Sequence, residues 1–273
     1  MKTYLFLIGV ALATQLTSCK KGSDGTHKGN RISSISSPQF NHLYNYDAQN
    51  RLAGIDYSVS NHMKVEYSSS GIVFQWYDGA GNPTNQRMEM NLVNGRVQYI
   101  VETVNNHKNE HSYYYDNEGR MNRAQAKRTT IGNNQLQSNG EALFTWNGDR
   151  LIKTVHTLQD RDGVKTDSLI WDMSYYGDKK FITWDDVGFP YLGKAPLAGM
   201  STGFGYRLPV TFLSEGIVPS VTALKVVARK NYSYHSGQWQ LTTSTSDYPE
   251  SYYQYDGQGK LSKWLNNIDI TWK

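Results

Sequence analysis

Residues 113–121 read Tyr-Tyr-Tyr-Asp-Asn-Glu-Gly-Arg-Met, the clearest structural signal in the chain. The aromatic residues Tyr113 and Tyr115 are two positions apart, so they lie on one face of an extended strand. Asp116 followed by Gly119 is typical of a tight turn, because glycine tolerates positive φ and aspartate accepts hydrogen bonds from nearby backbone amides. A basic and then an aliphatic residue start the return strand, so the pattern predicts an antiparallel β-hairpin.

The same pattern recurs along the chain, which predicts a large sheet built from successive hairpins. Further copies lie at 44–52, 144–151 and 253–261, and weaker copies at 92–97 and 175–181. The aromatic residues, 20 Tyr, 8 Phe and 7 Trp, favour half-buried strands over helix surfaces. Hairpins joined in order make an antiparallel meander, and many of them curl into a strongly bent sheet or a barrel. The predicted fold class is therefore all-β.

Length and composition exclude several classes of protein. The 273 residues are 13% aromatic and only 19% charged, unlike a disordered chain. The formal net charge of +4 is small and dispersed, so no nucleic-acid partner is expected. The single cysteine excludes an internal disulfide and a thiolate-rich metal site. We expect no cofactor.

The N-terminus has the features of a signal peptide. Met1-Lys2-Thr3 carries a positive charge, and Tyr4 to Ala13 forms an apolar run too short to span a membrane. We expect residues 1–18 to be removed from the mature protein.

The signal segment ends in Leu16-Thr17-Ser18-Cys19, which resembles the lipobox of bacterial lipoproteins. The resemblance implies cleavage before Cys19 and acylation of its sulfur, which would anchor the protein to a membrane. Lys20 in place of Asp favours the outer membrane by the Gram-negative sorting pattern, and leaves open whether the protein faces the periplasm or the cell surface. The Gly-, Ser- and Lys-rich residues 19–38 predict a flexible tether, and residues 39–273 the folded domain.

Two wider resemblances concern the domain. The hairpin pattern resembles the YD repeat of Rhs and teneurin shells, a likeness confined to the hairpin type. Together, the lipobox, the hairpins and a Gly/Pro-rich interruption at 184–215 resemble Bacteroidetes-type outer-membrane lipoproteins of a domain-of-unknown-function family with a porin-like fold. The resemblance implies a meander curled into a porin-like or soluble β-barrel at the cell envelope. It supplies no catalytic residues.

A membrane-spanning barrel is disfavoured by the residues between the paired aromatics. Asn45, Thr145 and Gln254 are polar, and the mean hydropathy of the chain is −0.62. Lipid-facing strands carry an aliphatic band instead.

The segment at about 187–219 is rich in Gly and Pro, so it cannot stay in a sheet for long. An insertion of this length plugs a barrel, covers an open edge or forms a lid over a ligand. Candidate ligand-binding residues in or beside it are Trp184, Phe189, Tyr191, Phe204 and Tyr206.

Tryptophans offer a second set of candidates, because an aromatic barrel interior could stack sugars or line a lipid site. The alternative is core packing and cross-strand stacking. The residues concerned are Trp76, Trp146, Trp171, Trp184, Trp239 and Trp264.

Three motifs suggest catalysis or metal binding, but none has the required context. His107-Lys108-Asn109-Glu110-His111 fits the HxxEH zinc motif, which needs a helix, whereas its surroundings predict a polar hairpin loop. Asp160-Arg161-Asp162-Gly163 lacks the remaining ligands of a calcium loop. Asp185 and Asp186 are adjacent, and adjacent carboxylates on a strand point in opposite directions. We therefore expect no enzyme and no metal site.

The expected function is that of a cell-envelope lipoprotein that binds an apolar, lipid-like or glycan ligand without catalysis. The alternative is a structural or accessory lipoprotein that docks on an outer-membrane protein complex. Ligand binding predicts an interior lined by aromatic residues, and docking predicts a filled barrel with an exposed apolar patch.

Overall fold

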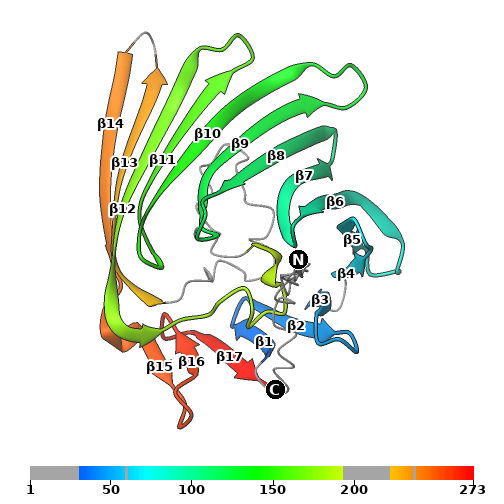
Figure 1. The fold of residues 1–273 in the computed structure, drawn as a ribbon, viewed down its shortest axis with the longest axis vertical. Coiled ribbons are helices and arrows are strands. Elements are labelled where there is room, and N and C mark those ends of the chain that lie inside the picture. The colour runs from blue at the N-terminus through cyan, green and yellow to red at the C-terminus, as the bar shows by residue number, and fades with distance from the viewer. Residues whose placement is uncertain (1–30, 59–60, 193–221, 236–237) are drawn as a thin grey trace, which may run out of the picture.

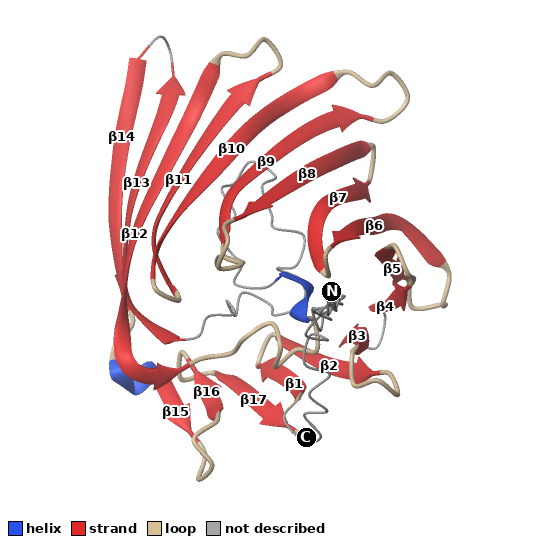
Figure 2. Ribbon diagram, viewed as in Figure 1, coloured by secondary structure: helices blue, strands red, loops and turns tan. Residues whose placement is uncertain are grey.

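A computed structural model describes residues 31–58, 61–192, 222–235 and 238–273, which form one antiparallel sheet of 17 strands (Figures 1 and 2). This confirms the predicted all-β meander. The strands are β1 (Ile32–Ser37), β2 (Phe40–Tyr46), β3 (Leu52–Ser58), β4 (Asn61–Tyr67), β5 (Gly71–Tyr77), β6 (Pro83–Val93), β7 (Arg96–Val104), β8 (His107–Tyr115), β9 (Met121–Thr130), β10 (Leu136–Asn147), β11 (Arg150–Asp160), β12 (Lys165–Lys180), β13 (Thr222–His235), β14 (Gln238–Asp247), β15 (Tyr253–Tyr255), β16 (Leu261–Trp264) and β17 (Ile268–Trp272). Two short 3₁₀ helices, η1 (Pro190–Leu192) and η3 (Glu250–Tyr252), are described as well. Neither is long and apolar enough to cross a membrane.

The strands follow one another around a curled sheet. Each strand from β1 to β13 pairs antiparallel with the next one, β15 pairs with β16, and β16 pairs with β17. β17 returns to pair with β1, so that Ile270 lies opposite Ile35 (Figure 1). No ladder joins β14 to β15 in the described residues, so the curled sheet has an open seam there.

One turn geometry recurs in five of the hairpins. The Asp116 Oδ1 atom accepts hydrogen bonds from the amides of Glu118 and Arg120, both at 2.9 Å, and Oδ2 accepts one from Arg120 Nε at 2.7 Å. Gly119 has φ of +76°, which an L side chain rarely adopts. The same pair of backbone contacts recurs at Asp47, Asp78, Asp160 and Asp256. The turn chemistry predicted from the sequence is therefore confirmed.

The weaker copy predicted at 175–181 is wrong. These residues do not turn back, because β12 continues to Lys180 and pairs with β13 on both sides of an irregularity at Tyr175. This copy lacks the Asp acceptor directly after its aromatic residues, so nothing holds a turn there.

In three of the four clear hairpin patterns, the second aromatic residue bonds to the strand that pairs with its own and precedes it in the chain. Its side chain donates a hydrogen bond to the carbonyl of an aliphatic residue that starts an earlier strand. Tyr115 reaches Val97 at 2.7 Å in this way, and Trp146 reaches Met121 at 2.7 Å. Equivalent bonds join Tyr46 to Ile32, Tyr67 to Leu52, Tyr175 to Leu151, and Trp272 to Leu261. This position requires a donor, which explains why it carries Tyr or Trp and not Phe.

The basic residue of the hairpin pattern packs against an aromatic ring that also bonds to a backbone carbonyl next to that basic residue. The Arg51 guanidinium is 4.0 Å from the ring centroid of Tyr67, whose hydroxyl bonds to the carbonyl of the neighbouring Leu52. Lys260 lies over Trp272 in the same way, at 5.4 Å. The cation and the backbone carbonyl therefore hold one aromatic side chain together.

The first strand lies within the segment predicted as a tether. Residues 19–38 were expected to be flexible, yet β1 occupies Ile32–Ser37 between β17 and β2. Ile32 and Ile35 are fully buried, and this burial stabilises the segment in the sheet. The boundary predicted at residue 39 is therefore too late, and residues 19–30 lie outside the described residues.

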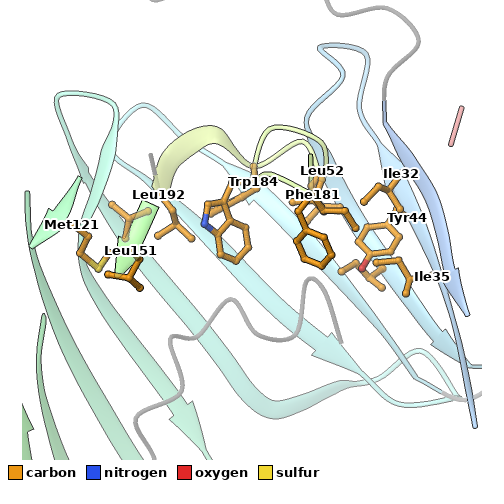
Figure 3. Close-up of a cluster of buried hydrophobic side chains, with 14 of the residues drawn as sticks. Ile32, Ile35, Tyr44, Leu52, Met121, Leu151, Phe181, Trp184 and Leu192 are labelled. Atoms are coloured by element: carbon orange, nitrogen blue, oxygen red, sulfur yellow. The ribbon is translucent and has the colours of Figure 1, made fainter. Parts of the chain in front are cut away.

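Residues 181–192, here called the strap, leave β12 and pack across one end of the curled sheet (Figure 3). The backbone amides of Ile32 and Leu52 donate to the carbonyls of Asp186 and Gly188, at 3.1 and 3.0 Å. Trp184 and Leu192 join the hydrophobic core, as Figure 3 shows. The strap is therefore part of the apolar core, and the role of the insertion as a plug, cap or lid stays a prediction. The remainder, 193–219, lies outside the described residues.

Candidate functional site

The inward face of the curled sheet carries polar side chains as well as the apolar core. Around the strap the inward residues are apolar, whereas along β7, β8, β11 and β12 several buried inward residues are polar. They are Glu102, Asn109, His111, Thr154, His156 and Asp167. Buried polar groups need hydrogen-bond partners, so this half of the interior is the candidate functional site.

β8 supplies one side of the site. His107, Asn109, His111 and Tyr113 alternate along the strand and share the inward face. Asn109 Nδ2 donates to the Glu102 carboxylate at 2.8 Å across the β7–β8 pair. The His111 Nε2 and Tyr113 hydroxyl atoms are buried and have no hydrogen-bond partner within the described chain.

The HxxEH motif does not form a metal site. It lies in β8 and not in the predicted hairpin loop, because the turn occupies Asn105 and Asn106 instead. His107 and His111 are four residues apart on an extended strand, about 13 Å at 3.3 Å per residue. Glu110 lies on the opposite face, where its carboxylate accepts from Lys108 Nζ at 3.0 Å. No three His, Cys, Asp or Glu side chains of the described residues form a group that could hold a metal ion.

Three neighbouring strands supply the other side of the site. Thr154 on β11, Trp171 on β12 and Arg229 on β13 lie directly opposite one another in the pairing register, so their side chains share one face. The Arg229 guanidinium is 4.7 Å from the Trp171 ring centroid. The Thr154 hydroxyl, the Trp171 indole nitrogen and Arg229 Nε are buried without a hydrogen-bond partner in the part of the chain that the structure describes.

His156 lies on the β11 side of the site. It follows Thr154 by two residues, and both of its ring nitrogens are buried without a partner among the described residues. Its ring meets Phe144 edge-on, with centroids 6.1 Å apart. Burial lowers the pKa of His156 to about 4, and that of His111 to about 4, so both imidazoles are neutral at pH 7.

Small residues separate the two sides. The pairing register places Tyr113, Ala124, Ala142 and His156 in one row across β8, β9, β10 and β11. Gly140 and Ala126 form the neighbouring row on β9 and β10. In these two rows, the inward wall between the polar strands therefore carries little more than methyl groups.

The candidate residues from the insertion lie at the strap. Trp184 and Phe189 are buried in the hydrophobic core, and Tyr191 is half-buried, with its ring 5.3 Å from Phe189 and 5.8 Å from Tyr67. The structure brings these three to the apolar end of the interior. Phe204, Tyr206 and Cys19 lie outside the described residues. A ligand-binding role for the strap residues stays a prediction.

The tryptophans divide between core and surface. Trp76, Trp171, Trp184 and Trp264 are buried, and Trp146 is half-buried and bonded to Met121. Trp239 is exposed on β14. Of the six, Trp171 belongs to the polar half of the interior.

The carboxylates of the two acidic motifs singled out in the sequence, at 185–186 and 160–163, lie at turns. Asp186 Oδ2 accepts from the amide and hydroxyl of Thr183, both at 2.8 Å, and Asp185 is exposed. The two lie in a turn and not on a strand, because β12 ends at Lys180. Asp160 accepts from the amides of Asp162 and Val164, which explains the sequence similarity to a calcium loop.

Sequence reasoning missed most of the polar site. His111 was considered only as a metal ligand, and Thr154, His156 and Arg229 were not singled out. Their alternation with outward residues was a usable signal, but the rows that join them depend on the pairing of strands far apart in sequence.

Comparisons with solved structures show which fold this is. A porin-like protein from Bacteroides vulgatus matches 89% of this chain and 99% of its own, with a TM-score of 0.59 and 11% sequence identity. A porin-like protein from Bacteroides uniformis matches 89% and 98%, with a TM-score of 0.44 and 11% identity. Neither a protein-family model nor a curated protein matches the chain. The chain is therefore similar in fold to the porin-like protein from Bacteroides vulgatus.

Proposed function

We propose that the protein is a non-catalytic binding protein of the bacterial cell envelope, held at the outer membrane by acylated Cys19. It takes an apolar or glycan ligand on the inward face of the curled sheet. The observation that carries this proposal is the set of buried inward polar atoms without partners in the described residues, on β8, β11, β12 and β13. A folded interior with no role in binding is expected to satisfy such atoms internally.

The outward face supports a lipid anchor as the means of attachment. Outward positions on neighbouring strands hold ion pairs, such as Arg87 with Glu89 on β6 and Lys108 with Glu110 on β8. Placing Arg or Lys against lipid tails near the membrane midplane costs about 2–4 kcal/mol each. Asn45, Thr145 and Gln254 are exposed, as expected for a wet outer surface.

Native mass spectrometry of the mature protein tests the proposal. The chain is expressed in a Gram-negative host, extracted from the outer membrane in mild detergent and ionised intact. We expect Cys19 to carry the mass of a diacylglyceryl group and an acyl chain, and a fraction of the protein to retain a further small molecule. An unmodified Cys19, or a chain that takes up no lipid and no glycan from added extracts, would contradict the proposal.

The second candidate function, docking on an outer-membrane protein complex, is favoured by β14. This strand has a partner on one side only among the described strands, so its other edge offers backbone groups for pairing. Trp239 and Leu241 are exposed on its outward face, with Tyr234 beside Trp239 at 5.3 Å. Crosslinking from a photoreactive residue at position 241 in intact cells tests this: a specific protein adduct supports docking, and none opposes it.

A further inference from the structure

The polar half of the interior has a composition that favours one class of ligand. Besides His107 at the start of β8, six side chains place buried polar atoms there with no partner inside the described chain. They are His111, Tyr113, Thr154, His156, Trp171 and Arg229, here called the polar cluster. All but Arg229 are more than nine-tenths buried. A buried donor or acceptor without a partner is destabilising, so the cluster favours a ligand that supplies hydrogen bonds.

The cluster is arranged in two parts across the inward wall. Thr154, Trp171 and Arg229 lie opposite one another on β11, β12 and β13, and His156 lies two residues along β11. His111 and Tyr113 lie on β8, three strand spacings away, about 14 Å along the sheet. This span is comparable with two or three linked sugar rings.

The row between the two parts of the polar cluster carries only small side chains. Ala124 and Ala142 stand in register between Tyr113 and His156, so no bulky side chain projects from β9 or β10 in that row. Phe144 borders the row through its edge contact with His156. Aromatic rings at the border of such a wall present apolar faces against which the C–H faces of sugars pack.

The hydrogen-bonding chemistry separates three ligand classes. The Trp171 indole and Arg229 Nε only donate, whereas each neutral imidazole has one donor and one acceptor nitrogen. A hydrocarbon chain would leave all of these atoms unpaired. A carboxylate or phosphate only accepts, so it would leave the acceptor nitrogens of His111 and His156 without a donor. Sugar hydroxyls donate and accept, and they can replace bound water group for group.

We propose that the polar cluster binds a neutral oligosaccharide, whose hydroxyls take the buried hydrogen-bonding positions between β8 and β13. This inference rests on the proposed function, and it names the ligand class and the site. The strap and its aromatic residues form the apolar base of the interior and are not part of this site.

Isothermal titration calorimetry of the full mature lipoprotein tests the inference, in a detergent without a sugar head group. The probes are maltohexaose, mannohexaose, xylohexaose and chitohexaose, with palmitate in parallel. Thr154→Val removes a hydroxyl while keeping the shape of the side chain, and Trp171→Phe removes the indole N–H while keeping an aromatic ring. Thr157→Val, on the opposite face of β11, is the matched control. Thermal unfolding confirms that each variant is folded.

We expect at least one hexasaccharide to bind. Each cluster variant should weaken that binding roughly three- to tenfold, as expected for one lost hydrogen bond, and the double variant should weaken it further. Thr157→Val should leave the affinity within about twofold of the parent.

Other results would overturn the inference in distinguishable ways. If palmitate binds and no hexasaccharide does up to millimolar concentration, the ligand class is wrong while the proposed binding function stands. If a hexasaccharide binds both cluster variants as tightly as it binds the parent protein, the sugar site lies outside the polar cluster. If neither kind of probe binds, the inference and the proposed function fail together.

Discussion

The hydroxyl of Tyr115, at the end of β8, donates a 2.7 Å hydrogen bond to the carbonyl of Val97, at the start of β7. Arg96, next to Val97, places its guanidinium 5.7 Å from the Tyr115 ring centroid. The bond closes the open end of the β7–β8 hairpin, at the opposite end from the turn at Asn105 and Asn106. Its recurrence at Trp146 and Met121 makes it part of the repeated design of the sheet.

Tyr115→Phe and Trp146→Phe test this connection. Each removes one donor and leaves a carbonyl unpaired, so we expect each to lower the free energy of unfolding by about 1–2 kcal/mol. Urea denaturation at pH 7 measures the change. Tyr114→Phe is the matched control, because its hydroxyl bonds to Gln125 on the exposed outer face and should cost under about 0.5 kcal/mol. Equal effects for Tyr114 and Tyr115 would contradict the role of the buried bond.

Gly188→Ala tests how closely the strap packs against Tyr46 and Leu52. Gly188 has φ of +69°, and a Cβ there would lie 2.7 Å from the Tyr46 ring and 3.0 Å from the Leu52 amide nitrogen. Gly163→Ala is the control, since Gly163 has φ of +79° and open space around it. Both variants carry the backbone cost of about 1 kcal/mol. Gly188→Ala should lose at least about 1 kcal/mol more in chemical denaturation, and equal losses would show that the strap is not tightly packed there.

Acid should destabilise the protein through its buried histidines. Folding lowers the pKa of His111 and of His156 by burial to about 4, from the ordinary histidine value of 6.5. Above pH 6.5 both states are neutral and stability is complete, whereas between pH 6.5 and 4 the unfolded chain binds protons that the folded chain does not. Each histidine therefore removes about 1.4 kcal/mol per pH unit in that window.

His156→Gln and His111→Gln check this assignment by urea denaturation at pH 7, 5.5 and 4.5. Each variant should reduce the dependence of the unfolding free energy on pH within the window. A variant with the same pH dependence as the parent would show that its histidine accepts a proton in the folded state as readily as in the unfolded one.

Thr154→Val should be neutral or stabilising in the ligand-free protein. The Thr154 hydroxyl is fully buried without a partner in the described residues, so removing it relieves a desolvation cost of about 1 kcal/mol. Thr183→Val is the contrasting variant, because the Thr183 hydroxyl bonds to Asp186 Oδ2 at 2.8 Å and its loss should destabilise the strap. Thermal denaturation measures both, and a loss of stability in Thr154→Val equal to that in Thr183→Val would contradict the unpaired state of the Thr154 hydroxyl.

Part of the fold was predictable because the contacts that form the Asp-based turns are local in sequence. The carboxylate of Asp116 contacts amides two and four residues ahead, and Gly119 supplies the one backbone conformation that the turn requires. These contacts need no tertiary context, so a hairpin with this turn could be located from nine residues. The boundary of the tether was missed because Ile32 and Ile35 are held by pairing with β17, more than 200 residues later.

By itself, the sequence determined the all-β class and the positions of the Asp-based turns, since these follow from backbone preference and local hydrogen bonding. Only the tertiary structure decided that Tyr113, Ala142 and His156 share one inward row, because that row depends on the register of three strand pairs. A slip of one residue in any pair would turn half of the row outward. The polar cluster is therefore a property of the assembled sheet, because desolvation and the lack of partners arise only when distant strands close around these atoms.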